Sequence, residues 1–291
     1  MQKIRDAVRL ALAEDVALGD ATTATLFRNP IGARGTIVAH QQLVIAGMAV
    51  AREVFAQIDP AIRVLRADDD GSNAEKNTTV LVVEGEAHSL LMAERVSLNF
   101  LQRLSGIATL TARFCQATKG YPTRILDTRK TTPGLRALEK WAVRLGGGLN
   151  HRHSLGDGML IKDNHLTLLR AQGRSVTDAC RLAREHGPHG LRLIVEAHSL
   201  AHVRDAVTGD ADVILLDNMT PAQVRQAVTI IKGRALVEVS GGITLDIAGE
   251  MAAAGADYLS IGALTHSAPA ANLSMDIAAT TRSRHSRKVR R

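Results

Sequence analysis

The chain has 291 residues, of which 45% are hydrophobic and 22% are charged. This composition excludes a disordered or collagen-like chain and is sufficient for one large domain or two smaller ones, each with its own core. No apolar run approaches the roughly 18 residues that a membrane-spanning helix requires, so we expect no membrane partner.

The net charge of +7 is concentrated at one end of the chain. Residues 282–291, RSRHSRKVRR, hold six Lys and Arg and no acid, and the rest is nearly neutral, with 30 Lys and Arg against 29 Asp and Glu. Aromatic residues make up only 2% of the chain, so few side chains can stack on bases. A short basic terminus is more often a solvated end than a binding arm, and we expect no nucleic-acid partner.

The first residues predict an amphipathic helix over 3–15, in which apolar residues recur every four positions. Its mixed charge is not typical of a signal peptide. The two cysteines, Cys115 and Cys180, lack metal-ligand spacing and fit a reducing compartment. We therefore expect a cytoplasmic protein.

The next segments predict strands and then a long helix. The runs 35–48, 62–71 and 79–87 alternate like strands, and apolar residues at helical spacing follow over 88–114. We expect Gly106 to divide this helix and to mark a domain boundary. The first domain would then be an N-terminal α/β domain.

Six short apolar runs alternate with helical patterns in the second part of the chain. They are TRILDTRK, GMLIKDNH, LRLIVEAH, ADVILLDN, ALVEVSGG and DYLSIGAL. This rhythm predicts successive βα units and a parallel sheet, closed or nearly closed as an α/β barrel. A doubly wound open sheet is the alternative, but no G-x-G-x-x-G motif follows the first strand.

Each of these runs ends on polar residues or glycine. The ends are Asp127 to Lys130, Lys162 to His165, Glu196, Asp217 with Asn218, Ser240 to Gly242, and Gly262. The carboxyl ends of barrel strands form the active face, so six strands would bring their polar residues to one mouth.

Five basic residues are predicted near this mouth: Arg129, Lys130, His151, Arg152 and Lys162. Guanidinium groups bind carboxylates through two hydrogen bonds, and a lysine is a mobile point charge suited to phosphate. Each residue alone would be interpreted as half of a surface ion pair. Five of them at strand ends indicate an anionic substrate.

The acids Glu196 and Asp217 end consecutive strands and are predicted to be neighbours. They could hold hydrated Mg²⁺, accept hydrogen bonds from ribose hydroxyls, or pair with nearby lysines. The turns in VSGGI and SIGALTHS are placed where barrels bind phosphate on backbone N–H groups. We favour a capping role for His266. For His165 and His153 we favour an orienting or polar-core role rather than zinc binding.

The motifs together resemble one family nearly end to end. They are LAEDVALGDATT, AERVSLNFLQRLSGIAT, DTRKTTPGLRALEKWAVRLGGGLNHR, LIKDNH, LLDN, SGGIT and IGALTHSAP. The family is quinolinate phosphoribosyltransferase. The resemblance implies an N-terminal α/β domain over 1–105, completed by the C-terminal segment 272–291, and an incomplete, six- or seven-stranded α/β barrel over 106–271. It also implies a homodimer, or a higher assembly, with each active site at the interface.

The resemblance also implies the ligand contacts. Quinolinate would be bound by Arg129, His151, Arg152 and Lys162, with Arg95 reaching in from the partner subunit. By itself Arg95, next to Glu94, would be interpreted as half of a solvated charge pair.

Phosphoribosyl pyrophosphate would be bound by the remaining residues of the site. Lys130, Glu196 and Asp217 would contact it, with the two acids holding its Mg²⁺ indirectly through the pyrophosphate. The residues implied for its 5′-phosphate are Ser240, Gly241, Gly242, Gly262, Ala263 and Leu264.

The implied activity is the Mg²⁺-dependent transfer of phosphoribosyl to quinolinate with decarboxylation, a step of de novo NAD biosynthesis. Lys130, Glu196, Asp217 and Lys162 would be catalytic, and either Lys162 or water would protonate the carbanion. Three features depart from the family pattern: Trp141 replaces a frequent tyrosine, Ser154 replaces a glycine, and LRLIVEAHSL has one acid where two or three are common.

Two alternatives compete with this activity. A molybdenum-transport-associated paralogue shares the fold, but its relatives tend to lack the intact His-Arg and Lys-Asp-Asn-His patterns that stand here. A non-catalytic phosphate or nucleotide sensor, or a nucleic-acid binder using the basic tail, is the alternative from another class. Retention of all the implied transferase residues argues against it.

Overall fold

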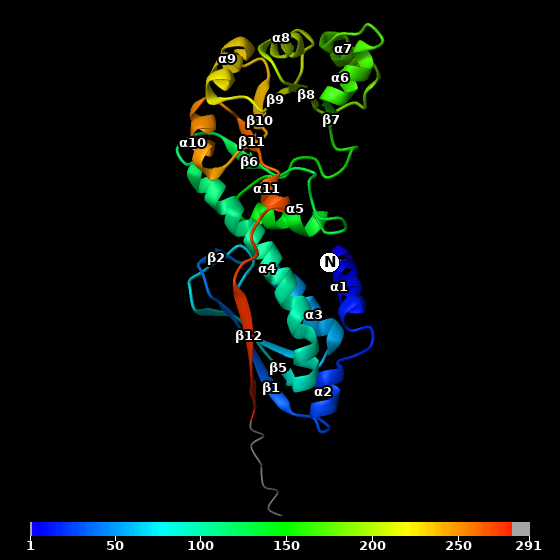
Figure 1. Ribbon diagram of the computed structural model, residues 1–291, viewed down its shortest axis with the longest axis vertical. Coiled ribbons are helices and arrows are strands. Elements are labelled where there is room, and N and C mark those ends of the chain that lie inside the picture. The colour runs from blue at the N-terminus through cyan, green and yellow to red at the C-terminus, as the bar shows by residue number, and fades with distance from the viewer. Residues whose placement is uncertain (1, 281–291) are drawn as a thin grey trace, which may run out of the picture. The chain divides into compact units, whose positions relative to one another are not determined.

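The computed structural model describes residues 2–280. The described residues divide into two compact units, one formed by residues 2–109 with 269–280 and the other by residues 110–268. Figure 1 follows the chain through both units by colour. The sequence predicted domain boundaries between residues 105 and 106 and between residues 271 and 272. Residues 281–291 of the predicted C-terminal segment 272–291 lie outside the described residues.

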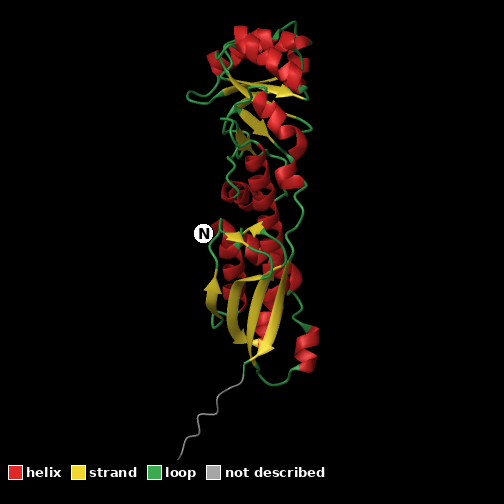
Figure 2. Cartoon of the chain, turned by 90° about the vertical axis from the view of Figure 1, so that its left-hand side faces the viewer, coloured by secondary structure: helices red, strands yellow, loops and turns green. Residues whose placement is uncertain are grey.

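The first unit is built on a four-stranded antiparallel sheet in the order β12-β1-β5-β3 (Figure 2). The strands are β1 (Gly32–Ala39), β3 (Arg63–Ala67), β5 (Thr78–Glu86) and β12 (Leu273–Ala279). β12 pairs with β1 in a register that places Ile37 opposite Met275. The C-terminal segment therefore adds the last strand to this sheet.

Helices complete the first unit, and they lie on one side of the sheet in Figure 2. They are α1 (Gln2–Asp15), α2 (Ala21–Leu26), α3 (Met48–Ile58) and α4 (Ala87–Ala117), and the short strands β2 (Leu43–Val44) and β4 (Asn73–Ala74) pair separately. Ile37 of β1, Phe55 of α3 and Leu90 of α4 are at most 1% exposed. The core of this unit therefore draws on both the sheet and the helices.

Two local predictions in this unit are wrong. Gly106 does not interrupt helix α4. This glycine instead makes room for another segment, since a Cβ atom there would lie 2.1 Å from the carbonyl oxygen of Pro269. The predicted strand 35–48 is a strand only to Ala39 and again at β2. Gly47, with φ of 101°, then turns the chain into α3.

The second unit contains a six-stranded parallel sheet in the order β6-β11-β10-β9-β8-β7. The strands are β6 (Arg124–Leu126), β7 (Met159–Ile161), β8 (Leu193–Ala197), β9 (Val213–Asp217), β10 (Leu236–Ser240) and β11 (Tyr258–Ser260). Strands β7 to β11 lie side by side in chain order, and the first barrel strand, β6, pairs with the last, β11. This circular order is that of an α/β barrel interrupted between β6 and β7. The prediction of an incomplete barrel is confirmed, and the doubly wound alternative is excluded.

Helices connect the barrel strands: α5 (Arg136–Leu145), α6 (Asp163–Arg170), α7 (Val176–His186), α8 (Leu200–Thr208), α9 (Pro221–Ile231) and α10 (Leu245–Ala253). The short helix α11 (Ala263–His266) follows the last barrel strand. Ser199 and Thr220 cap α8 and α9 by accepting hydrogen bonds from backbone N–H groups. These caps begin each helix within a few residues of a strand end. None of the helices within residues 2–280 has the length and apolar character needed to cross a bilayer.

Candidate active site

Alternation along the barrel strands separates an apolar floor from a polar mouth. Residues two apart on a strand share a face. On β9, Leu215 therefore shares a face with Asp217, and on β10 Leu236 shares one with Glu238 and Ser240. Leu215 belongs to a buried apolar cluster against which Leu236 packs. The polar residues thus follow the apolar ones toward the carboxyl ends of the strands.

A cavity of about 700 Å³ opens at these strand ends. Residues from or just beyond all six barrel strands line it. The predicted residues among them are Arg129, Lys130, His151, Arg152, Lys162, Glu196, Asp217, Ser240, Gly241, Gly242, Gly262 and Ala263. The shared mouth expected from the strand ends is therefore present.

A buried ion pair fixes the loop that carries His151. The ammonium of Lys140 contacts the carboxylate of Asp127, and both side chains are 0% exposed. Asp127 also accepts hydrogen bonds from Asn150 Nδ2 (2.6 Å) and from the backbone N–H of His151 (2.9 Å). Lys140 donates in addition to the carbonyl of His151 at 3.1 Å. The pair therefore holds both backbone polar groups of His151.

Two guanidinium groups lie at the cavity wall with few partners. Burial lowers the pKa of Arg152, and the charge of Arg129 lowers it further. Arg152 donates to the carbonyl of Gly158 at 3.1 Å, and Nε of Arg129 is buried with no hydrogen-bond partner among the described residues. Because arginine remains protonated in proteins, this wall is suited to an anion that accepts from both groups.

Glu238 is a buried carboxylate in the same wall. It is 2% exposed, and its Oε1 atom lies 3.4 Å from Nε2 of His151. The hydroxyl of Ser260 donates to the same oxygen. Sequence reasoning missed Glu238, although its position two residues before Ser240 predicts an inward-facing side chain.

A second acidic region includes Glu196 and Asp217, as predicted, together with His198. Nε2 of His198 lies 2.9 Å from Oε1 of Glu196, and Nδ1 lies 3.6 Å from Oδ2 of Asp217. Burial raises the pKa of Glu196, and the neighbouring charge of Asp217 raises it further. Two carboxylates are therefore held close together at a cost in electrostatic free energy, which a bound cation would reduce.

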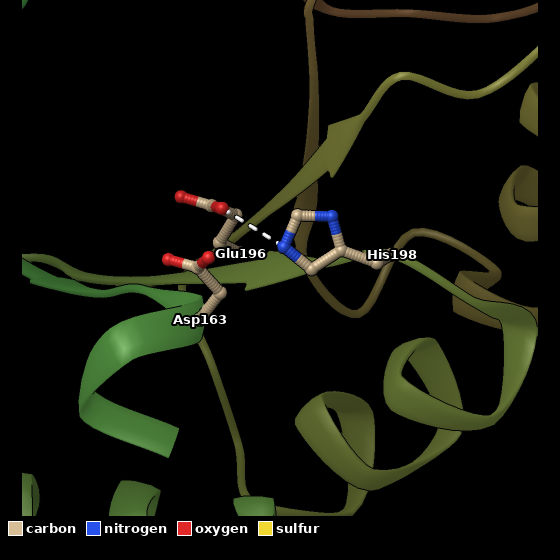
Figure 3. A group of neighbouring side chains, drawn as sticks. All are labelled: Asp163, Glu196 and His198. Atoms are coloured by element: carbon tan, nitrogen blue, oxygen red, sulfur yellow. Dashed lines mark ion pairs between the residues drawn. The ribbon is translucent and has the colours of Figure 1, made fainter. Parts of the chain in front are cut away.

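Asp163, Glu196 and His198 also place one potential metal-ligand atom each within 4.8 Å of one another. Figure 3 shows the three side chains turned toward a common point, Asp163 from the start of α6 and the other two from β8 and the residue after it. Sequence reasoning assigned no role to Asp163 or His198. Their places in KDNH and at a strand end were the available signal.

The glycines after β10 form a tight turn. Gly241 and Gly242 have φ of 89° and 60°, which favour glycine. A Cβ atom on Gly241 would also lie 2.2 Å from Oδ1 of Asn218. His266 of α11 lines the cavity, where the sequence had favoured a cap, and its Nδ1 lies 2.6 Å from the hydroxyl of Ser267.

Comparisons with known proteins identify the family of the chain. Models of the quinolinate phosphoribosyl transferase N-terminal and C-terminal domains match residues 20–105 and 107–276. The chain belongs to the quinolinate phosphoribosyltransferase family. The resemblance inferred from the motifs is confirmed.

Individual relatives extend over nearly the whole chain. The probable nicotinate-nucleotide pyrophosphorylase (carboxylating) of Bacillus subtilis (strain 168) is 40% identical over 264 residues, which is 91% of this chain and 90% of the relative. The nicotinate-nucleotide pyrophosphorylase (carboxylating) of Mycobacterium leprae is 41% identical over 94% of this chain and 96% of its own. The crystal structure of NadC from Streptococcus pyogenes has 39% identity and a TM-score of 0.89, covering 96% of this chain and 97% of that one.

Two of the residues implied by the family pattern lie elsewhere. Arg95 is an exposed residue of α4, in the first unit. Leu264 is 0% exposed in α11 and is not among the residues that line the cavity. Both assignments remain predictions.

The loop after Arg152 closes in spite of its departure from the family pattern. Oδ2 of Asp157 accepts hydrogen bonds from the backbone N–H groups of His153 (2.8 Å) and Ser154 (3.0 Å). His165 accepts one from the backbone N–H of Lys162 at 3.0 Å, which caps the start of α6. Ser154 is therefore accommodated in a turn that Asp157 stabilises.

Proposed function

We propose that the protein transfers the phosphoribosyl group of phosphoribosyl pyrophosphate to quinolinate and decarboxylates the product to nicotinate mononucleotide, a step of NAD biosynthesis. The relatives from Nicotiana tabacum are named decarboxylating quinolinate phosphoribosyltransferases. The observation that carries the proposal is the cavity itself: Arg129, Arg152 and Lys162 line it together with Glu196 and Asp217. Several cations and two acids in one cavity suit a dicarboxylate beside a sugar pyrophosphate.

Quinolinate would be bound at the cationic wall. Its two adjacent carboxylates need several donors at once, and the buried, unpartnered Nε of Arg129 supports this role. Arg152, His151 and Lys162 complete the set. These groups must orient the carboxylate that departs without stabilising it so strongly that its loss is suppressed.

Phosphoribosyl pyrophosphate would be bound across the rest of the cavity. Lys130 would contact the diphosphate, and Glu196 and Asp217 would accept hydrogen bonds from ribose hydroxyls. Backbone N–H groups of the turns Ser240–Gly242 and 262–264 would hold the 5′-phosphate. Gly241 supports this role, because its left-handed backbone keeps the turn tight.

Mg²⁺ would lie beside the diphosphate, held indirectly by Glu196 and Asp217. The donor set fits such a cation, because burial and the neighbouring charge of Asp217 raise the pKa of Glu196, and a bound cation would offset both effects. When bound, Mg²⁺ would neutralise negative charge that develops on the leaving diphosphate. Asp163 and His198 border the same region.

The chemistry proceeds in two stages. The ring nitrogen of quinolinate forms a bond to the anomeric carbon while the bond to pyrophosphate breaks, and Lys130 stabilises the leaving charge. Carboxylates nearby stabilise the cationic sugar of the transition state. The bond to the adjacent carboxylate then breaks, CO₂ leaves, and the electron pair remains on C2 beside the quaternary nitrogen until a proton arrives.

The protein is further proposed to act as a homodimer in which Arg95 of the partner subunit completes each site. Exposure of Arg95 on α4 is compatible with this role. Mixing Arg95→Ala subunits with Lys130→Ala subunits would test it. We expect heterodimers to recover part of the activity that each homodimer lacks, because one of the two sites is then intact. Absence of any recovery would exclude the shared site.

The decisive test of the activity is incubation with quinolinate, phosphoribosyl pyrophosphate and Mg²⁺. CO₂ and nicotinate mononucleotide should appear together in equal amounts, and Lys130→Ala should abolish both. Lys119→Ala, at an exposed position of the second unit, is the matched control and should behave like the wild type. If nicotinate is accepted and quinolinate is not, the proposal is wrong.

A further inference from the structure

Glu238 is a charged side chain of the cavity for which the reaction above has no use. A buried carboxylate is unexpected in a wall that binds dicarboxylates, because it repels them and is costly to desolvate. We propose that Glu238 is a positioning residue that orients His151, and that His151 delivers the proton to C2 after CO₂ has left. This inference rests on the proposed function.

The geometry resembles a carboxylate–histidine pair, in which one ring nitrogen faces the carboxylate and the other is left to transfer a proton. Nε2 of His151 is buried, has no hydrogen-bond partner among the described residues, and lies at an ion-pair distance of 3.4 Å from Oε1 of Glu238. The N–H directions of the two ring nitrogens diverge, so Nδ1 is directed away from Glu238 when Nε2 faces it. A carboxylate at one ring nitrogen fixes the orientation of the ring and stabilises the protonated form during proton transfer.

The supporting contacts hold this pair in place from two directions. Ser260, which is 5% exposed, donates its hydroxyl to Glu238 from the neighbouring strand β11. The backbone N–H and C=O of His151 are bound by the buried Asp127–Lys140 pair. A histidine that only contributed positive charge to a carboxylate site would not need its ring and its backbone fixed separately.

The chemistry favours His151 over the two arginines of the same wall as the acid. Arg129 and Arg152 do not give up a proton in proteins, because the guanidinium group is too weak an acid. A general acid works best when it can lose its proton near the operating pH, which is the ordinary range of imidazole. A side chain that contacts the departing carboxylate is also the group nearest to C2 once CO₂ has gone.

Loss of CO₂ leaves an electron pair on C2 of the pyridinium ring. The Nδ1–H bond of the protonated His151 breaks as a C2–H bond forms, which leaves neutral imidazole with its Nε2–H directed to Glu238. Solvent then returns one proton to Nδ1, so each turnover consumes one proton and releases one CO₂.

The test separates phosphoribosyl transfer from decarboxylation in a single assay. Pyrophosphate, CO₂ and nucleotide products are measured for the wild type and for Glu238→Gln with quinolinate, phosphoribosyl pyrophosphate and Mg²⁺. The wild type should release one pyrophosphate for each nicotinate mononucleotide. A carbanion at C2 that is not protonated recombines with CO₂ and returns to the dicarboxylate nucleotide. In Glu238→Gln the ratio of nicotinate mononucleotide to pyrophosphate should therefore fall at least about tenfold, part of the factor of roughly 10²–10⁴ that a positioned acid supplies. Mass spectrometry should then detect the dicarboxylate nucleotide.

Three further variants exclude a merely structural effect. Glu238→Asp should restore part of the product ratio, and Ser260→Ala should lower it less than Glu238→Gln does. Val239→Ala, which loosens the same strand at a 0% exposed position, should leave the ratio at one. An unchanged ratio in both Glu238→Gln and Ser260→Ala, whatever their rates, overturns the inference. If the wild type releases no pyrophosphate, the proposed function itself has failed, which is a different result.

Discussion

Replacement of Lys140 by methionine tests whether the buried ion pair organises the site. The substitution keeps the length of the side chain and removes the ammonium that contacts Asp127, where both side chains are 0% exposed. Asp127 keeps its donors from Asn150 and His151 but loses its counter-charge. Breaking a buried pair from one side typically costs about 3–5 kcal/mol. The lost hydrogen bond to the carbonyl of His151 adds about 1 kcal/mol.

The assay is thermal and urea unfolding, followed by activity below the transition. At about 2–4 °C per kcal/mol, the combined loss of about 4–6 kcal/mol should lower Tm of Lys140→Met by about 8–24 °C. The exposed control Lys119→Met should change stability by no more than about 0.5 kcal/mol. The double variant Asp127→Asn/Lys140→Met should be more stable than the sum of the single losses predicts, because no bare charge remains buried. A loss below about 1 kcal/mol for Lys140→Met, or strict additivity, would refute the reasoning.

Four further outcomes are expected. Glu196→Gln should raise Tm at pH 7 while abolishing transfer, since the raised pKa of Glu196 means that its ionised form opposes folding. The gain in Tm should vanish as the pH falls below both the folded and the unfolded pKa of Glu196. A difference in Tm that stays unchanged across the pH series would contradict this. Gly106→Ala should lower Tm in spite of the roughly 1 kcal/mol that helix propensity favours for alanine, because its Cβ would meet the carbonyl oxygen of Pro269. Burial raises the pKa of Cys180 to about 11, so iodoacetamide at pH 8 should label it in mass spectra only after unfolding. Deletion of residues 282–291 should leave transferase activity intact, and loss of ligand binding would instead favour a role for the basic tail.

The barrel could be predicted because the pattern that indicates each of its strands is local in the sequence. Each strand is a short apolar run that ends on polar residues, and the rule that such ends meet at one mouth needs no knowledge of distant contacts. This is why residues as far apart as Lys130 and Gly262 were assigned to one cavity. The circular order that joins β6 to β11 followed from the same alternation of strands and helices.

The buried polar partners could not be predicted for the opposite reason. Glu238 and His151 meet across the barrel interior, and the pairing of Asp127 with Lys140 depends on how α5 packs against the end of β6. Neither contact follows from spacing along the chain. Gly106 was misread because a glycine in a helical pattern looks like a break, whereas here it makes room for residues more than 160 positions later.

The central claim is that the cations of one barrel mouth bind a pyridine dicarboxylate beside a sugar pyrophosphate. A crystal structure of the protein with quinolinate and a non-hydrolysable analogue of phosphoribosyl pyrophosphate tests it most directly. We expect both carboxylates of quinolinate within hydrogen-bonding distance of Arg129, Arg152 and Lys162, with the diphosphate near Lys130. Quinolinate bound outside this cavity, or the dicarboxylate and the diphosphate in exchanged places, would contradict the account.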